Sequence, residues 1–179
     1  MGGRDAFIGK LDSLFTADSK LEGESTSVDI SGLIGQYAHG NEPSHHIAHL
    51  YNYVGQPWRT QEIVDEVLHT LYFNNPDGLS GNEDCGQMSA WYILNAMGFY
   101  QVCPGKPVFI HATPLFNEAT VHLKDGKSFK VIAHNNSRDN KYVRSIVLNG
   151  NKLETPFFTH QDIVDGGTLE LTMGSEPLK

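Results

Sequence analysis

The hydrophobic pattern of this chain changes its period near Pro104, and that change limits the folds open to it. Before this point apolar residues recur every three to four positions, which is typical of amphipathic helices. After it they alternate with polar residues, which is typical of strands with one buried face. The sequence therefore predicts an α+β chain, in which a helical half, 1–103, precedes an antiparallel sheet or sandwich, 104–179. No flexible linker separates the halves, so we expect them to pack together.

The expected elements follow from where each pattern starts and stops. Four helices are expected, the first beginning at Asp5 and the others at Ser44–Val54, Pro57–Phe73 and Asp84–Met97. The polar segment Asp18–Ser27 is expected to be a loop, and 29–37 a short helix or an ordered loop. The expected strands are Val108–Ile110, Ala119–Leu123, Ser128–Ala133, Ser145–Leu148 and Thr168–Thr172. Asp125-Gly126 and Asn149-Gly150 supply the positive φ angles of tight hairpin turns.

Charge argues against two classes of partner. The formal net charge is −8, with 13 basic and 21 acidic side chains and no basic cluster, which disfavours nucleic acid and anionic membranes.

No apolar run reaches the roughly 18 residues of a membrane span, and no signal peptide is recognisable. Cys85 and Cys103 leave both their pairing and the redox compartment open. Since the chain starts just before a helix and stops just after a strand, we expect it to be part of a larger protein.

The first polar motif precedes the second expected helix and reads His39-Gly40-Asn41-Glu42-Pro43-Ser44-His45-His46. Asn41 and Glu42 carry the oxygen ligands that a hard cation such as calcium prefers. Glu42 could instead only favour the positive end of the helix that follows. His39 and His45 or His46 are expected to line a sugar pocket. Because His45 and His49 share a helical face, zinc is an alternative, but zinc peptidases carry glutamate where this chain has His46.

The second polar motif, Asn82-Glu83-Asp84, precedes the fourth expected helix. A hydrolase that uses water as its nucleophile needs a rigidly held carboxylate to accept a proton. The alternative is that Asp84 only caps the helix. Among the aromatic residues, Trp91 and Tyr92 are expected in the core, whereas Trp58, at a helix entrance beside Pro57, is a candidate to stack on a sugar.

Three segments together resemble the C-terminal part of glycoside hydrolase family 92, the calcium-dependent exo-acting α-mannosidases. They are Tyr37-Ala38-His39-Gly40-Asn41-Glu42-Pro43-Ser44-His45-His46, Tyr51-Asn52-Tyr53-Val54-Gly55-Gln56-Pro57-Trp58 and Gly78-Leu79-Ser80-Gly81-Asn82-Glu83-Asp84-Cys85-Gly86-Gln87-Met88-Ser89-Ala90-Trp91-Tyr92. The three motifs occur in the family's order and the resemblance covers nearly the whole chain.

The resemblance implies inverting hydrolysis of terminal α-mannosides in a mannose-containing glycan, with calcium on the sugar's vicinal hydroxyls. Asn41 and Glu42 then fall in the calcium region and Asp84 at the general base. Where members often carry a second acidic residue, this chain has Asn82, so Glu83 is the other candidate. The helical half would be an arc of an (α/α)6 barrel. His39 and Gly40 would help to shape the site of the leaving-group sugar.

The family's general acid lies in a Glu-Gly-Asn-Ala-Trp type motif that this chain lacks, as it lacks the family's N-terminal β-sandwich domain. We therefore expect the chain alone to be inactive and to need the missing N-terminal part of the same enzyme. By resemblance that enzyme is bacterial and periplasmic or secreted. A rival interpretation is a non-catalytic carbohydrate-binding module that uses Asn135, Asn136 and Asp139.

Overall fold

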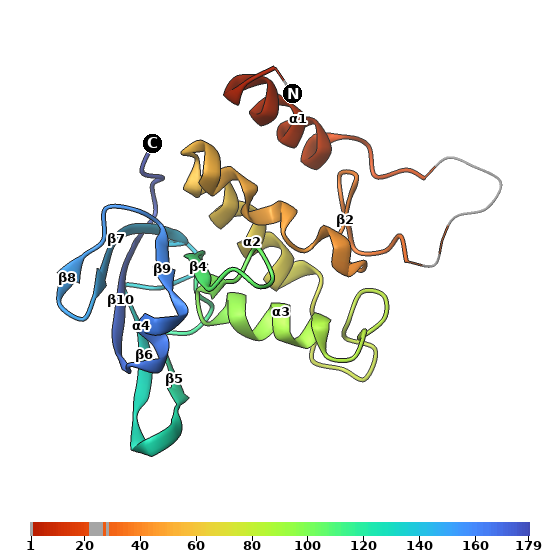
Figure 1. Ribbon diagram of the computed structural model, residues 1–179. Helices are drawn as coiled ribbons and strands as arrows, with labels where there is room; N and C mark the ends of the chain where they lie inside the picture. Colours follow the sequence, from red (N-terminus) through yellow and green to blue (C-terminus); the bar gives the residue numbers. More distant parts are fainter. Residues whose placement is uncertain (1, 22–26, 28) are drawn as a thin grey trace.

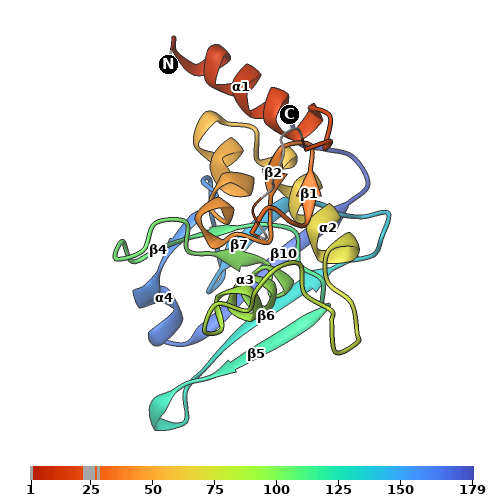
Figure 2. The same cartoon turned by 90° about the vertical axis from the view of Figure 1, so that its right-hand side faces the viewer.

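The computed structural model describes residues 2–21, 27 and 29–179. In this part of the chain, helices come first and most strands follow, which confirms the α+β class (Figure 1). Helix α1 lies at one end of the molecule and the β5–β6 hairpin at the opposite end (Figure 2). The proposed boundary between residues 103 and 104, and the barrel of which the helices would be an arc, stay predictions.

The helical part contains α1 (Arg4–Thr16), α2 (Pro57–Thr70) and α3 (Gln87–Ala96). A small hairpin of β1 (Leu33–Ile34) and β2 (Tyr37–Ala38) stands where the sequence left a short helix or an ordered loop. The predicted loop Asp18–Ser27 falls largely on 22–26, outside the described residues. Pro57 occupies the first turn of α2, where its missing N–H costs no hydrogen bond.

The second expected helix is not an α-helix. The structure has two 3-10 helices here, Glu42–Ser44 and Ile47–Val54. Their backbone hydrogen bonds span three residues, as from the His49 N–H to the His46 carbonyl at 3.1 Å. Gly55 ends the second one with a φ of 70°, a conformation that glycine adopts without strain. The apolar spacing correctly predicted a helical segment but does not distinguish the two helix types.

The second part of the chain forms two sheets and one short helix. The larger sheet has the order β5-β6-β10-β7-β8, and the smaller one the order β3-β4-β9. Their bounds are β3 (Phe99–Tyr100), β4 (Val108–His111), β5 (Glu118–His122), β6 (Ser128–His134), β7 (Tyr142–Leu148), β8 (Asn151–Lys152), β9 (Phe157–Thr159) and β10 (Gly167–Gly174), with α4 (His160–Val164). All five expected strands are present, and both expected hairpin turns have positive φ.

The expectation of a purely antiparallel sheet is wrong at one pairing. Strand β10 lies in the centre of the larger sheet, antiparallel to β7 but parallel to β6, with Leu169 opposite Val131. The sheet is therefore mixed. Parallel neighbours need a crossover connection, and here the chain between β6 and β10 runs through β7, β8, β9 and α4. Alternation along a single strand carries no information about this order, which explains the error.

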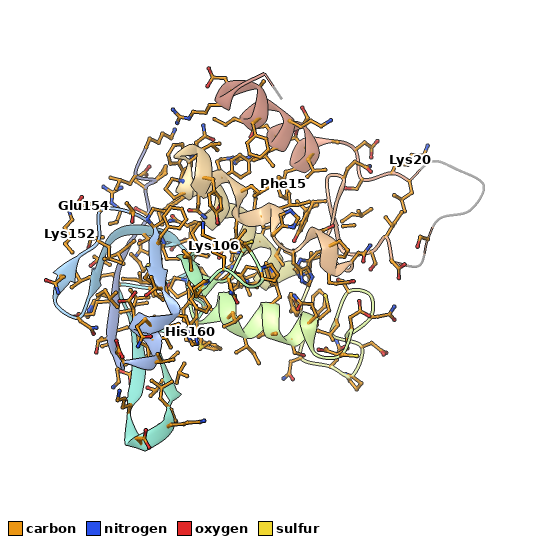
Figure 3. The ribbon with its side chains drawn as sticks, viewed as in Figure 1. Phe15, Lys20, Lys106, Lys152, Glu154 and His160 are labelled. Carbon is orange, nitrogen blue, oxygen red and sulfur yellow. The ribbon has the colours of Figure 1, made fainter. Side chains whose placement is uncertain are left out.

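Two apolar clusters hold the fold together. One gathers helical residues around Trp91 and Tyr51, which are completely buried, and Phe15 points into it from α1 (Figure 3). The other lies under one face of the larger sheet, where alternate residues of β6 and β10 are buried. Leu94 of α3 packs against both clusters. Trp91 is thus a core residue, as expected, and Tyr92 is half-buried.

An ionic cluster around Asp65 ties α2 to the loop between β6 and β7. The Asp65 side chain is 10% exposed. Its carboxylate oxygens lie 2.8 Å from the Lys141 ammonium, 3.5 Å from the Arg138 guanidinium and 3.2 Å from the His69 imidazole. Nearby, Tyr142 donates a hydrogen bond to Glu62, and the Val143 N–H donates one to Gln61. Polar contacts of these kinds fix α2 against β7.

We expect Asp65→Asn to lower the free energy of unfolding by about 1–3 kcal/mol. The substitution leaves Lys141 and Arg138 without their anionic partner, although both remain partly hydrated. Chemical denaturation of the full-length protein measures the loss. Asp139→Asn, on the exposed surface of the same loop, is the control and should change stability by less than about 0.5 kcal/mol. Equal losses for both variants would contradict the anchoring role of Asp65.

Candidate active site at two facing loops

The two polar motifs lie against each other in the structure. We call residues 39–42 the first loop and residues 80–86 the second loop. A Cβ atom added to Gly40 would lie 2.9 Å from the Ser80 carbonyl oxygen, and one added to Gly81 would overlap the Gly40 carbonyl oxygen. Gly81 also has a φ of +80°. The contact therefore requires glycine in both loops, and it brings together motifs that lie some forty residues apart in sequence.

The Asp84 and Glu42 carboxyl groups meet across this contact. The hydrogen bond between them raises the pKa of Asp84 above its ordinary value, as do desolvation and the negative charge of Glu42, whereas nearby His45 acts in the opposite direction. Both side chains are exposed to solvent. Two carboxyl groups in contact favour sharing a proton or binding a cation, because two adjacent negative charges repel each other.

Asp84 sits on an unusual backbone that leads into α3. Asp84, Cys85 and Gly86 have φ angles of 49°, 56° and 98°, three successive left-handed residues. This conformation is unfavourable in free energy for residues other than glycine, and such strain concentrates at functional sites. The Asp84 side chain makes no capping hydrogen bond to α3. The capping explanation for Asp84 is therefore not supported by the geometry.

Glu83 instead holds the start of α3. Its carboxylate accepts hydrogen bonds from the Ser89 N–H at 3.2 Å and the Ser89 hydroxyl at 2.9 Å. Because its oxygens are occupied in this way, Glu83 is less free than Asp84 to receive a proton from water. Asn82 is exposed beside it.

His39 begins the first loop, and its side chain is completely buried. The Tyr37 hydroxyl lies 2.9 Å from its Nδ1, and its Nε2 lies 2.7 Å from the Tyr72 hydroxyl. Since the Tyr72 O–H donates to the Met88 carbonyl, it accepts from His39 Nε2–H. Burial, assisted by His45, lowers the pKa of His39 to about 3, so the imidazole is neutral. The contacts with Tyr37 and Tyr72 hold the imidazole in place inside the protein, which indicates a structural role for His39.

His45 is also buried, but it lies beside the carboxyl pair. Its Nε2 lies 3.0 Å from the His39 carbonyl, and its Nδ1 lies 3.1 Å from the Gln87 amide nitrogen. Burial lowers the pKa of His45, partly offset by the hydrogen bond to His39 and by Asp84. The Trp91 indole N–H donates to the His45 carbonyl at 3.2 Å. The core of the helical half thus positions this imidazole directly.

His46 and His49 take opposite positions. His46 is exposed near Glu42, whereas His49 is completely buried and stacks on Tyr100 with ring centroids 4.9 Å apart. Burial lowers the pKa of His49 to about 3. In the described part of the chain, no group of three His, Cys, Asp or Glu side chains is placed to hold a metal. With both nitrogens of His45 already in hydrogen bonds, the geometry does not favour a zinc site at His45 and His49.

A cavity of about 310 Å³ opens beside Glu42. Gln87 lies in its wall and donates to the Tyr100 hydroxyl at 3.3 Å as well as to His45. Gln87 was not among the candidates from the sequence, although it lies only three positions after Asp84. The lining residues are Glu42, Pro43, His45, His46, Gln87, Tyr100, Gln101, Val102 and Pro104.

The remaining candidates do not line this cavity. Trp58 lines a different cleft, together with His111. Asn136 donates to the Leu115 carbonyl, and the Asn135 carbonyl accepts from Asn140. Cys85 and Cys103 are both exposed free thiols, so they form no disulfide. The Asn41 side chain makes no capping bond to the 3-10 helix that follows it.

Comparison with known proteins shows which family this chain is similar to. A family model described as the glycosyl hydrolase family 92 catalytic domain matches residues 1–175. A protein of Arthroderma benhamiae named "Uncharacterized secreted glycosidase" is 29% identical over 179 residues, covering 98% of this chain and 21% of its own length. No helix in the described residues is long and apolar enough to cross a membrane.

Solved structures show the same likeness. The family GH92 α-mannosidase BT3965 from Bacteroides thetaiotaomicron, in complex with mannoimidazole, is 42% identical with a TM-score of 0.91 over 98% of this chain and 23% of that one. The family GH92 inverting mannosidase BT2199 from the same organism is 42% identical with a TM-score of 0.83, covering 99% of this chain and 25% of that one. This chain thus spans about a fifth to a quarter of the length of these relatives.

Proposed function

This chain belongs to glycosyl hydrolase family 92, and from that membership we propose that the full-length protein is an exo-acting α-mannosidase. Its substrates are terminal α-mannosides of mannose-containing glycans, and its reaction inverts the anomeric configuration. The observation that supports this proposal most directly is the contact of Asp84 with Glu42 across two loops that pack glycine against glycine. Likeness to an α-mannosidase whose structure is in complex with mannoimidazole supports the substrate class.

Asp84 is the general base in this proposal. Its carboxylate accepts a proton from the water molecule that attacks the anomeric carbon. The strained backbone and the packing of Trp91 behind His45 keep the carboxylate in place. His45, His46 and His39 belong to the substrate side of the site, with His39 acting through the loop that it supports. Asn82 and Glu83 flank the base, and Glu83 fixes the start of α3.

Glu42 does not suit the role of general acid. Inverting glycosidases hold their acid and base roughly 6.5–9.5 Å apart so that water fits between base and sugar. Glu42 is close enough to Asp84 to raise the pKa of the Asp84 carboxyl, which does not fit that separation. We therefore place the acid outside these 179 residues, in keeping with the absence of a Glu-Gly-Asn-Ala-Trp type motif. The chain alone is then inactive.

Calcium fits the first loop as part of a larger ligand set. Asn41 and Glu42 offer amide and carboxylate oxygens, which this ion prefers, and the carboxyl contact with Asp84 is one that a cation would relieve. Since calcium takes six to eight oxygens, water, sugar hydroxyls or residues outside the chain must supply the others. When bound, the ion would hold the sugar's vicinal hydroxyls and assist distortion of its ring.

We expect the full-length protein to release mannose from an aryl α-mannoside, with β-mannose as the first anomer in proton NMR spectra. Chelation with EDTA should reduce the rate at least tenfold, and calcium, but not zinc, should restore it. The isolated 179-residue chain should show no turnover. α-Mannose as the first product, or full activity in EDTA, would contradict the inversion or the calcium role respectively. Secretion, expected from the named fungal relative, is tested by cell fractionation.

A further inference from the structure

A second cleft lies away from the carboxyl pair. It has a volume of about 190 Å³ and shares no lining residue with the cavity beside Glu42. We call it the Trp58 cleft. Its walls come from the first turns of α2, the end of β4, strands β7 and β8 and the segment that follows β8. The lining residues are Pro57, Trp58, Gln61, His111, Val143, Arg144, Ser145, Ile146, Lys152, Leu153, Glu154, Thr155, Pro156 and Leu178.

His111 is the least explained polar residue of this cleft. Its side chain is only 5% exposed, and in the described part of the chain its Nδ1 has no hydrogen-bond partner. Burial lowers the pKa of His111 to about 4, so the imidazole is neutral and offers one donor and one acceptor. An unpartnered buried polar atom costs about 1–3 kcal/mol. The Nδ1 atom is itself closed to solvent, so a bound hydroxyl group would remove that cost only after a small shift of the cleft wall.

Two further side chains complete the wall. Gln61 is 2% exposed, and its Oε1 accepts the Val143 N–H at 3.2 Å, which holds the amide rigidly. Trp58 is half-buried, so part of its indole surface remains open to solvent. An aromatic face next to a fixed amide and a neutral imidazole is suited to a ligand that is apolar on its ring faces and hydroxylated at its edge.

Three of the side chains that line the cleft are charged, and they lie toward its outer part. Lys152 pairs with Glu154 at 3.1 Å, and Figure 3 labels both, whereas Arg144 keeps its charge and donates to the Glu176 carbonyl at 2.8 Å. The uncharged wall of Trp58, Gln61 and His111 suits a neutral ligand. The volume of the cleft corresponds to about six water molecules, which is about the size of one sugar ring.

We propose that the Trp58 cleft is a second, non-catalytic carbohydrate site that binds one neutral sugar unit. Trp58 stacks on the ring, while His111 and Gln61 hydrogen-bond its hydroxyl groups. The choice of mannose as the sugar rests on the proposed function. The proposal that the cleft binds a sugar does not depend on that function, because the residues of the cleft are separate from Asp84 and Glu42. Such a site would hold the protein on a polymeric glycan while a chain end is cleaved elsewhere.

The test is affinity electrophoresis of the full-length Asp84→Asn protein, in which turnover is expected to be lost, through native gels containing yeast α-mannan. We expect retardation by the mannan, and at least tenfold weaker apparent affinity after Trp58→Ala. Tyr53→Ala removes an exposed aromatic side chain outside the cleft and is the matched control, with unchanged retardation expected. Thr155→Trp fills the cleft from its exposed rim without deleting a buried group, and it should act like Trp58→Ala.

Each outcome decides the proposal. Unchanged retardation in both Trp58→Ala and Thr155→Trp overturns it and leaves the cleft to water or another part of the protein. If Trp58→Ala fails to fold, as judged by its melting temperature, Thr155→Trp decides alone. Trp58-dependent retardation, together with a wild-type full-length protein that releases no mannose, supports the cleft while rejecting the mannosidase proposal. Retardation by a β-glucan gel but not by mannan would keep the cleft and replace mannose with glucose.

Discussion

Asp84→Asn is expected to lower kcat for α-mannoside hydrolysis by the full-length protein about 10³-fold, with little change in substrate affinity. General base catalysis contributes roughly 10²–10⁴-fold, and an amide cannot take up the proton from water. Asparagine has the same shape and tolerates the left-handed backbone at this position, where φ is 49°. The change therefore removes the base while leaving the turn intact. Steady-state kinetics, together with calorimetric binding of a mannose mimic, measure the two effects separately.

The control for this experiment is Asp125→Asn. Asp125 is also exposed and also has a left-handed backbone, with φ of 59°, but it lies in the distal β5–β6 turn. We expect its kcat to stay within twofold of that of the wild type. If Asp84→Asn retained more than a tenth of the activity, Asp84 could not be the base. Loss of mannose binding together with turnover would instead assign Asp84 to ligand or calcium binding.

Gly81→Ala is expected to reduce kcat/KM by about 10²-fold, because it pushes the two loops apart. The added methyl group would overlap the Gly40 carbonyl oxygen, which is backbone and cannot rotate away. A displacement of about 1 Å between catalytic groups costs on the order of a hundredfold in rate. Kinetics on the full-length protein test this, and a crystal structure of the variant should show Asp84 and Glu42 separated.

Gly105→Ala separates this steric effect from backbone strain. Gly105 has the same φ of +80°, yet nothing lies within 4 Å of the position that its Cβ would take. Both variants therefore place an alanine in the left-handed conformation, which costs roughly 1–2 kcal/mol of folding free energy. Only in Gly81→Ala does the added methyl group meet the opposing loop. Comparable activity losses in the two variants would show that the contact between the loops does not control the geometry of the site.

The sequence predicted the elements with the strongest periodicity. Helix α2 and strands β6 and β10 lie where the apolar spacing placed them, because burial on one face imposes that spacing. Strands β3 and β9 and helix α4 have two, three and five residues, which is too short for a period to show. The position of β10 between β6 and β7 depends on contacts between distant segments, so no local pattern contains it.

For the candidate site too, local motifs were predictable from the sequence, whereas contacts between side chains were not. The sequence singled out both loops because carboxylates and amides gathered before helices need an explanation, and the structure brings Asp84 to Glu42. It could not show that Glu83 is bound to Ser89, that His39 lies between two tyrosines, or that Trp58 faces another cleft. Those facts depend on which side chains meet after folding. The roles assigned to the site residues stay predictions until the variants above are measured.

The central position of β10 also affects how the chain can fold during synthesis. The β5–β6 and β7–β8 hairpins are local and can form early, but each keeps an open edge until Gly167–Gly174 has been made and inserts between them. Completion of the sheet is thus delayed until β10 has been translated, and such non-local pairing is slow. A ribosome that stalls before Gly167 would release two unjoined hairpins with exposed edges, which are prone to aggregate.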